Sequence, residues 1–379
     1  MAVDIGGTFT DVVLQVPDGR RATTKLLTTH AHPGEAVLAG IEQVLEMSGL
    51  SATDVGLIIH GTTLATNALI ERSGAKTALL TTEGHRDALE MAHEDRFEQY
   101  DIMIDRPQPL VPRYLRLPVR ERMDFTGRPL VPLDANSVEA ALLVLDEHKI
   151  ESVAIGYLHA YVNPEHEQRT AELLAKLRPD LSISLASEVC PEIREYERLS
   201  TACANAYVRP LMARYLQRLA GELKERHFSC PFFMMSSGGG LTTLETAAKF
   251  PIRLVESGPA GGAILAAQVA KCCELAHLLS FDMGGTTAKL SLIDNYRPLH
   301  SRNFEVDRVY RFKKGSGLPV RIPVIEMVEI GAGGVSIARL DKLDRIQVGP
   351  ESAGSEPGPA AYGLGGTRPT VTDADVGMG

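Results

Sequence analysis

Two segments of the chain carry the same arrangement of an aspartate, two glycines and a threonine. Residues 4–11 read DIGGTFTD and residues 282–289 read DMGGTTAK, so the two aspartates lie 278 positions apart. Each segment continues into an apolar run, at residues 12–14 and 290–293. The chain therefore carries one short device twice.

The residues of this device, the repeated segment of aspartate, two glycines and threonine, can bind a phosphate group. Paired glycines let the backbone turn sharply and bring its N–H groups close to an anion, the threonine adds a hydroxyl donor, and the aspartate can hold hydrated Mg²⁺. The alternative is a plain hairpin turn between two apolar strands, which the same residues also form. The repetition with matched flanks favours the phosphate interpretation, and it predicts that the two turns face one another.

A second functional loop is predicted at His60-Gly61-Thr62-Thr63. Apolar residues 57–59 form a strand before it, and residues 64–73 form a helix after it. Ligands of α/β proteins lie at such strand-to-helix turns. The alternative, which the sequence leaves open, is that a threonine only caps the helix and that the histidine is buried and structural.

The elements that must position these loops alternate between strands and helices, which indicates the α/β class. Three strands open the chain, and a helix then begins at Pro33 and ends at Gly49. Further strands are predicted at 76–82, 152–158, 181–186 and 232–235, and further helices at 86–92, 134–148, 164 onwards, 195–226 and from 256.

Three stretches lack a clear period. Residues 106–132 are predicted to form an extended loop with short edge strands, residues 303–321 are a charged segment, and residues 348–366 are a loop or linker rich in Gly, Pro and Ser. In the helix at 195–226, Pro210 is expected to kink or split the helix.

Length, charge and cysteine usage bound the class of protein. With 379 residues the chain exceeds what one hydrophobic core usually serves, so two domains are expected. A net charge of −9 without a Lys/Arg block argues against a nucleic-acid partner. The five cysteines show no Cys-x-x-Cys spacing, so no zinc site or disulfide framework is indicated and a reducing cytoplasm is expected. No signal peptide or membrane span is predicted.

Five motifs, in order along the chain, resemble those of the hydantoinase A/5-oxoprolinase family. They are residues 3–11 (VDIGGTFTD), 60–68 (HGTTLATNA), 256–262 (ESGPAGG), 281–289 (FDMGGTTAK) and 349–359 (GPESAGSEPGP). The resemblance implies an α/β fold of duplicated ribonuclease-H-like (actin-like ATPase) units around an ATP cleft. It places the first unit at residues 1–275, with an inserted α/β segment at about 76–190 and a long connecting helix, and the second at residues 276–379.

The resemblance also implies ATP and Mg²⁺ as cofactors. Asp4 and Asp282 are the expected catalytic residues and would hold Mg²⁺ through water. Nucleotide contacts are expected from Gly6, Gly7, Thr8, Thr10, Gly284, Gly285, Thr286, Thr287, Gly331, Gly333 and Gly334. Candidates for substrate contacts or supporting positions are His60, Thr62, Thr63, Asn67 and Glu256.

Two departures from the family pattern bear on these expectations. Ala288 and Lys289 stand where the first device has Thr10 and Asp11, so the two loops are not chemically equivalent. The first strand looks clipped and the second unit looks truncated. An incomplete unit is expected to expose apolar side chains around residues 278–293 and 324–337.

The function implied by the resemblance is that of a nucleotide-binding subunit of an ATP-dependent hydrolase of cyclic amides such as hydantoins or 5-oxoproline. It would phosphorylate the amide oxygen of a small-molecule substrate and work with a hydantoinase-B-type partner chain. Two alternatives stay open: the ATP-using subunit of an acetone- or acetophenone-type ketone carboxylase, and a non-catalytic ATP-binding fragment. The motifs do not separate the first two, because both would use the same phosphate loops.

Overall fold

The first device lies inside a six-stranded sheet. The computed structural model describes residues 1–29, 32–94, 96–308, 310 and 313–379. In the sheet, β1 pairs antiparallel with β2 and parallel with β4, and the strand order is β12-β11-β4-β1-β2-β3. The strands are β1 (Ala2–Ile5), β2 (Phe9–Gln15), β3 (Arg21–Leu27), β4 (Ile58–Thr62), β11 (Phe232–Met235) and β12 (Leu241–Thr243).

Helix α1 (Pro33–Ser48) covers one face of this sheet. Proline occupies its first turn and Gly49 ends it with φ of 67°, as the sequence predicts. The helix packs Val37, Ile41 and Val44 against Val12 and other buried strand residues. This apolar face is therefore the face of β1 and β2 that points away from Asp4.

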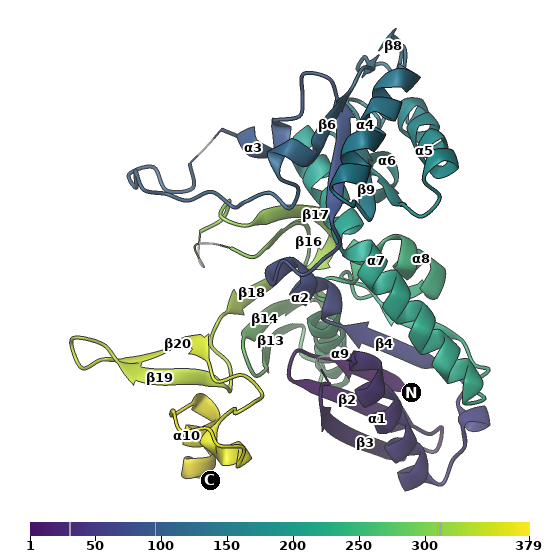
Figure 1. Ribbon diagram of the computed structural model, residues 1–379. Coiled ribbons are helices and arrows are strands. Elements are labelled where there is room, and N and C mark those ends of the chain that lie inside the picture. The colour runs from purple at the N-terminus through teal and green to yellow at the C-terminus, as the bar shows by residue number, and fades with distance from the viewer. Residues whose placement is uncertain (30–31, 95, 309, 311–312) are drawn as a thin grey trace.

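Residues 76–190, which the resemblance predicts to be an inserted segment, contain a second sheet that is parallel and lies in the upper lobe of Figure 1. Its strand order is β10-β9-β5-β6, and its central strands β5 and β9 are buried throughout. The strands are β5 (Thr77–Thr82), β6 (Arg116–Val119), β9 (Ser152–Gly156) and β10 (Ser182–Leu185), with the small hairpin β7 (Arg122–Met123) and β8 (Pro129–Val131). The helices are α3 (Ala88–Met91), α4 (Ala135–Glu147), α5 (Glu165–Leu177) and α6 (Ala186–Val189).

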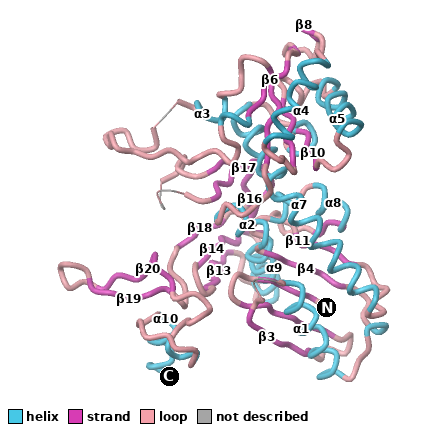
Figure 2. The backbone as a smooth tube through the Cα atoms, in the orientation of Figure 1, coloured by secondary structure: helices cyan, strands magenta, loops and turns pink. Residues whose placement is uncertain are grey.

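One long helix, α7 (Glu195–Glu225), joins the two lobes, and Figure 2 shows it as a continuous cyan coil. It runs unbroken past Pro210, so of the two expected effects of this proline, a kink or a split, the split is wrong. Buried side chains from Leu199 to Val208 hold its first half in the core, which explains how the helix tolerates the missing N–H of proline. The shorter helices α2 (Leu64–Ile70), α8 (Leu244–Lys249) and α9 (Ser257–Cys272) surround it or follow it.

The second device lies in a smaller antiparallel sheet beside α9. In this sheet β14 (Ala288–Asp294) is central, and it pairs with β13 (His277–Met283), β15 (Arg297–Pro298) and β18 (Met327–Ile330). The chain continues into β19 (Ser336–Leu340), β20 (Ile346–Ser352) and α10 (Val371–Met378), at the lower left of Figure 1. Strand β20 means that the stretch 348–366 is only partly a loop.

The charged segment 303–321 forms most of a hairpin, which the sequence did not predict. Strand β16 (His300–Val306) pairs with β17 (Leu318–Ile325), and residues 309, 311 and 312 of this stretch lie outside the described residues. Val306, Val320 and Val324 from this hairpin share one core cluster with side chains of α2 and α7. The hairpin, although it follows the second device in sequence, therefore packs on the first part of the chain.

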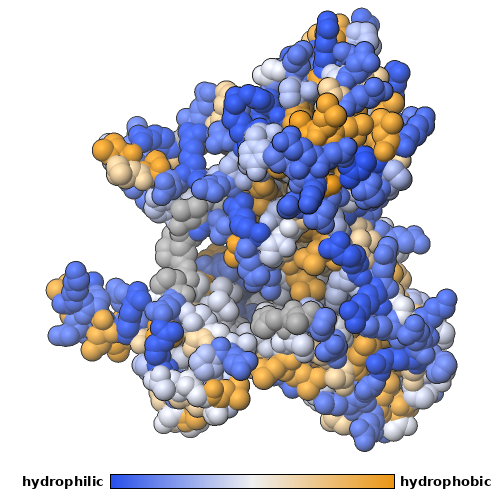
Figure 3. Space-filling view, viewed as in Figure 1, coloured by the Kyte–Doolittle hydropathy of each residue, from blue (hydrophilic) through white to orange (hydrophobic). Residues whose placement is uncertain are grey.

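Apolar side chains are exposed around the second device, as expected for residues 278–293. Leu279, Phe281 and Met283 all point to one face of β13 and are 56%, 59% and 41% exposed. The expectation holds only in part for residues 324–337, where Val328 and Ile330 are exposed but Val324, Ile325, Val335 and Ile337 are buried. The surface in Figure 3 is hollowed between the two lobes and mixes hydrophilic areas with hydrophobic patches. Among the described helices, none has both the length and the apolar character needed to cross a bilayer.

Candidate functional site

The two glycine turns are built in the same way. The Gly6 N–H donates to the Phe9 carbonyl at 2.8 Å, and the Gly284 N–H donates to the Thr287 carbonyl at 2.9 Å. The strand registers also agree, because Asp4 lies opposite Asp11 and Asp282 lies opposite Lys289. The local hairpin that the sequence predicts twice is thus present twice.

The two turns meet head to head. A Cβ atom placed on Gly285 would lie 3.1 Å from the Thr8 hydroxyl oxygen, so the tip of the second turn touches the first. The electrostatic influence of Asp282 on Asp4 also reflects their proximity. The prediction that both turns face one another is confirmed.

Asp4 has an unusual setting for a carboxylate. Burial, followed by the nearby carboxylates of Asp11 and Asp282, raises the pKa of Asp4 to about 6. Its Oδ1 atom is buried and has no hydrogen-bond partner within the described part of the chain. A Cβ on Gly61 would lie 2.6 Å from this atom and one on Gly258 would lie 3.0 Å away, so two glycines make room for it.

These features fit a hydrated divalent cation. Mg²⁺ prefers oxygen ligands, keeps several waters and is usually bound through one or two carboxylates together with phosphates. Asp4 provides a buried carboxylate oxygen without a donor, and the exposed carboxylate of Asp282 lies near it. No cluster of three or more His, Cys, Asp or Glu side chains suited to a metal was found in the residues that the structure describes. Two carboxylates assisted by phosphates are therefore the arrangement that these residues fit.

His60 is fully buried on β4, opposite Val3 of β1. Its Nδ1 lies 3.2 Å from the Val3 carbonyl and its Nε2 lies 2.8 Å from the Tyr215 hydroxyl, and the Phe232 ring stacks on it. Burial lowers the pKa of His60 to about 4, so the ring is neutral at physiological pH. Of the two interpretations of this residue, the structure supports the buried structural histidine, which steadies β1 beside Asp4.

The threonines of the second loop contact β1 and the start of α9. The Thr63 hydroxyl donates to the Ile5 carbonyl at 3.1 Å, next to the first glycine turn. Thr62 is fully buried, and its backbone N–H and carbonyl both bind the Ser257 hydroxyl at 3.1 Å. Asn67 comes close to the first turn, because its Nδ2 would lie 3.7 Å from a Cβ on Gly7. These residues join the first turn to the start of α9.

An ion pair ties the start of α9 to the second hairpin. Glu256 precedes α9 in a left-handed conformation with φ of 62°, and its carboxylate accepts from the Lys289 ammonium. Both side chains are largely buried, at 11% and 14% exposed. Lys289 therefore has a partner of its own, which explains why it need not match Asp11 of the first device.

Gly331, Gly333 and Gly334 lie against or next to the second glycine turn. A Cβ on Gly333 would lie 2.5 Å from the Gly285 carbonyl oxygen, and the Gly334 N–H donates to the Gly284 carbonyl at 3.0 Å. Gly331 lies just before them, and a Cβ on Gly349 would lie 3.1 Å from its carbonyl oxygen. These three glycines, from which nucleotide contacts are expected, thus lie against the second glycine turn.

Thr10 corrects one expectation. It was predicted to contact nucleotide, but its side chain is fully buried and its hydroxyl lies 3.0 Å from the Thr28 hydroxyl. Thr28 in turn donates to the Gly6 carbonyl at 3.0 Å. Because alternate residues of a strand point to opposite faces, Thr10 lies on the face away from Asp4 and Asp11. It supports the first turn from behind.

Sequence reasoning did not single out several residues that shape this site. Ser257 was quoted only as part of a motif, and Tyr215 lies on α7 far away in sequence from its partner His60. The only sequence signal for Ser257 was its position between Glu256 and Gly258 at a strand-to-helix turn. No local pattern marks Tyr215, because its role follows from the packing of α7 on the sheet.

Two family models together match nearly the whole chain. Residues 1–177 match the model described as "Hydantoinase/oxoprolinase N-terminal region", and residues 198–379 match the model described as "Hydantoinase/oxoprolinase". The interval between the two matches, residues 178–197, contains β10, α6 and the first three residues of α7.

Named relatives cover all of this chain. The caprolactamase subunit alpha of Pseudomonas jessenii is 36% identical over the whole chain, which covers 54% of that protein. The acetophenone carboxylase gamma subunit of Aromatoleum aromaticum is 33% identical over the whole chain, which covers 52% of that protein. The crystal structure of the ATP-dependent caprolactamase from Pseudomonas jessenii superposes with a TM-score of 0.83 at 35% identity, over 100% of this chain and 54% of the other. The chain thus spans about half the length of these relatives.

Proposed function

The chain belongs to the hydantoinase/oxoprolinase family, and from this premise we propose that it is the nucleotide-binding part of an ATP-dependent hydrolase of cyclic amides. The observation that carries the proposal is the contact of the two glycine turns, with Thr8 against Gly285 and the orphaned Asp4 oxygen beside them. Support also comes from a relative that is named as a caprolactamase subunit.

In this proposal the two hairpins belong to two actin-like units of ribonuclease-H-like fold, divided near residues 275 and 276, and ATP lies between them. Backbone N–H groups of the glycine turns and the Thr8, Thr286 and Thr287 hydroxyls contact the phosphates. Asp4 and Asp282 hold Mg²⁺ through water, which would neutralise phosphate charge. Positioning and charge neutralisation of this kind account for most of the catalysis of phosphoryl transfer.

The chemistry follows from the inertness of an amide. Resonance makes the carbonyl carbon of a lactam a poor electrophile, so water attacks it slowly. Transfer of the terminal phosphoryl group of ATP to the amide oxygen forms a new P–O bond, releases ADP and makes this carbon more electrophilic. Water can then open the ring and release phosphate. We propose that a partner subunit supplies the residue that activates water, since the two named relatives are themselves subunits.

Two other functions compete with this one. The acetophenone carboxylase gamma subunit, at 33% identity, supports a ketone carboxylase as the second candidate. The third is an ATP-binding protein without catalysis of its own. These candidates differ in what stimulates ATP consumption: a lactam, a ketone with bicarbonate, or nothing.

The test is calorimetric titration with ATP, with and without Mg²⁺, followed by ATP hydrolysis assays in the presence of caprolactam, 5-oxoproline, or acetophenone with bicarbonate. We expect Mg²⁺-dependent binding and turnover stimulated by a cyclic amide. Asp4→Asn and Asp282→Asn should each lower Mg²⁺-dependent turnover on the order of 10²-fold or more, because each removes charge that positions the phosphates. The exposed Asp344→Asn is the control. A well-folded chain that binds no nucleotide would exclude the proposal.

A further inference from the structure

Each glycine hairpin places a second charged residue directly opposite its leading aspartate. In the first hairpin Asp4 lies opposite Asp11, and in the second Asp282 lies opposite Lys289. Residues that face one another in this way have Cβ atoms about 4.5–5.5 Å apart, so their charges interact directly. Because the two opposing residues carry opposite charges, each affects its aspartate in a different way.

In both hairpins a residue from a third element pairs with this opposing charge. Lys25 Nζ on β3 lies 2.8 Å from an Asp11 carboxylate oxygen, and Glu256, immediately before α9, forms an ion pair with Lys289. The leading aspartates themselves form no ion pair with any side chain that the structure describes. The opposing charge is thus neutralised in each hairpin, while the leading carboxylate stays unpaired.

The partner of Lys289 is fixed to the first part of the chain. Glu256 has a left-handed backbone with φ of 62°, and its N–H donates to the Thr66 hydroxyl at 3.2 Å. The next residue, Ser257, makes two hydrogen bonds with the backbone of Thr62. These contacts hold Glu256 in place through elements other than the second hairpin.

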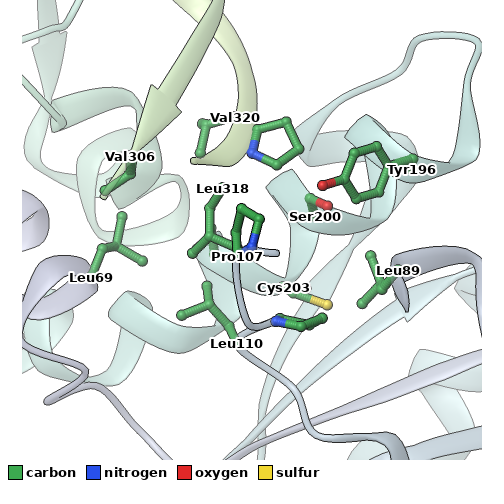
Figure 4. Close-up of a pocket in the computed structure, with 13 residues that line it drawn as sticks. Leu69, Leu89, Pro107, Leu110, Tyr196, Ser200, Cys203, Val306, Leu318 and Val320 are labelled. Carbon is green, nitrogen blue, oxygen red and sulfur yellow. The ribbon is translucent and has the colours of Figure 1, made fainter. Parts of the chain in front are cut away.

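Thr66 belongs to α2, and this helix is itself held in the core. Its Leu69 lies among side chains of α7 and the β16–β17 hairpin, which Figure 4 shows around a narrow space of about 20 Å³. A space of this size holds about one water molecule, so α2 has little room to move toward the hairpin. The anchor of Glu256 is therefore rigid.

The start of α9 lies along both leading aspartates. A Cβ atom on Gly258 would lie 3.0 Å from Asp4 Oδ1, and one on Gly262 would lie 3.8 Å from Asp282 Oδ2. The two glycines are four residues apart, so they share one face of the helix. Asp282 and its neighbour Lys289 therefore both point to the side of their sheet on which α9 begins.

Stability alone does not explain the ion pair of Glu256 and Lys289. The two side chains are only 11% and 14% exposed, and the cost of removing two charges from water often exceeds what their attraction returns. Apolar residues of similar size often stabilise such a contact at least as well. The presence of charge here therefore points to a role in orienting Lys289.

We infer that Glu256 is a positioning residue that keeps the Lys289 ammonium away from Asp282. Without Glu256, the largely buried ammonium would lack a partner and would turn to the carboxylate directly opposite it, which is that of Asp282. An ammonium bound there would neutralise this carboxylate and repel a divalent cation. The consequence for metal binding rests on the proposed function, whereas the competition of two carboxylates for Lys289 rests on the geometry alone.

The first test is a crystal structure of the Glu256→Gln chain without metal or nucleotide. Lys289 Nζ should lie within about 4 Å of an Asp282 carboxylate oxygen, the usual limit for an ion pair. An ammonium that stays beside residue 256 or points into solvent would overturn the inference. If Glu256→Gln does not fold, Glu256→Asp decides, because its shorter side chain should release Lys289 toward Asp282 in the same way.

The second test measures metal affinity. Mn²⁺ takes the same oxygen ligands as Mg²⁺ and can be followed by electron paramagnetic resonance, with ADP present to supply phosphates. Glu256→Gln should weaken Mn²⁺ binding about tenfold or more, because the ammonium beside Asp282 repels the cation. The double variant Glu256→Gln with Lys289→Met should recover most of this loss, since the competing ammonium is gone. Glu188→Gln, which removes the partner of Lys249 far from the hairpins, is the matched control and should bind Mn²⁺ as the wild-type chain does.

A purely structural ion pair predicts a different pattern. In that case the double variant would bind Mn²⁺ as weakly as Glu256→Gln, and the inference would be overturned. It would also be overturned if Lys289→Met alone weakened binding tenfold, because Lys289 would then act on the phosphates. A wild-type chain that binds no Mn²⁺ in the presence of ADP would count against the proposed function, and the crystal structure would then decide this inference by itself.

Discussion

The two glycine hairpins have the same register but lie in very different surroundings. Strand β1 pairs with β2 on one side and with β4 on the other, and α1 covers its apolar face. Strand β13, among the residues described, pairs only with β14, and its apolar face is exposed. Ile5 is fully buried, whereas Met283, at the corresponding position, is 41% exposed. The same backbone device therefore forms with or without a surrounding core.

This difference sets the chemistry of the two aspartates. Asp4 lies under neighbouring backbone and its pKa is raised by burial, whereas Asp282 is exposed. A turn motif fixes which groups are offered to a ligand, but the neighbouring elements fix how strongly water competes for them. Substitutions at equivalent positions of the two hairpins, 278 residues apart, can therefore measure how much the surrounding elements contribute to the stability of each hairpin.

The largest effect on stability is expected from the apolar position next to each glycine turn. Ile5→Ala should lower the free energy of unfolding by about 2–5 kcal/mol, because it leaves a cavity in a closed core. Met283→Ala should change it by no more than about 0.5 kcal/mol, because the side chain is already in contact with water. Chemical denaturation of both variants measures the difference. Equal losses would mean that the second hairpin is covered in solution.

The pH dependence of stability should differ between the two aspartates. Because the pKa of Asp4 is raised from 3.8 to about 6, the folded state binds more protons than the unfolded state between these values. The contribution of the protonated group is complete below about pH 4 and is lost as pH rises through about 6. Asp4→Asn should remove this loss and stabilise the chain at pH 7 by at most about 3 kcal/mol.

Asp282→Asn is the matched control for this experiment. Because burial is the largest cause of the raised pKa of Asp4 and the charge of Asp282 is a smaller one, the profile of stability against pH from 4 to 7 should change much less in Asp282→Asn than in Asp4→Asn. Thermal unfolding across this pH range, without nucleotide or Mg²⁺, measures both variants. An Asp4→Asn profile identical to the wild-type profile would contradict the assigned burial of this carboxylate.

The smallest expected effects on stability concern one lysine near each glycine turn, Lys289 and Lys25. Lys289→Met leaves the buried carboxylate of Glu256 without its partner and should cost about 1–3 kcal/mol. Lys25→Met breaks an ion pair with Asp11 in which both side chains are about half exposed, and it should cost less than about 1 kcal/mol. The double variant Lys289→Met with Glu256→Gln should recover part of the loss. A loss from Lys25→Met as large as that from Lys289→Met would reverse the comparison.

Local signals predicted most of the first part of the fold. Pro33 and Gly49 bounded a helix because the ring of proline and the left-handed conformation of glycine have direct backbone consequences. The device at residues 4–11 predicted its own hairpin and its counterpart for the same reason. These predictions needed no knowledge of what lies on the other side of each strand.

Predictions that depend on long-range packing were less successful. The hairpin of β16 and β17 was read as a charged segment, because its strands alternate polar and apolar residues around a loop with many charges. The side chain of Thr10 was assigned to the wrong face, and Lys289 received no role, because the partner of each lies elsewhere in the chain. Tyr215 illustrates the same limit, since its contact with His60 joins positions 155 residues apart.

The placement of the β16–β17 hairpin also bears on how the chain is made. Domains commonly fold one after another as the ribosome releases them. Here the core around α2 and α7 includes Val320, Ile322 and Val324 from β17, so this core is incomplete until about 250 residues after α2 have been synthesised. Until then, Leu69, Val208 and Met212 lack their contacts with the β17 side chains. Late closure of this core leaves early apolar side chains exposed during a long stretch of synthesis, when a partly folded chain is most prone to aggregate.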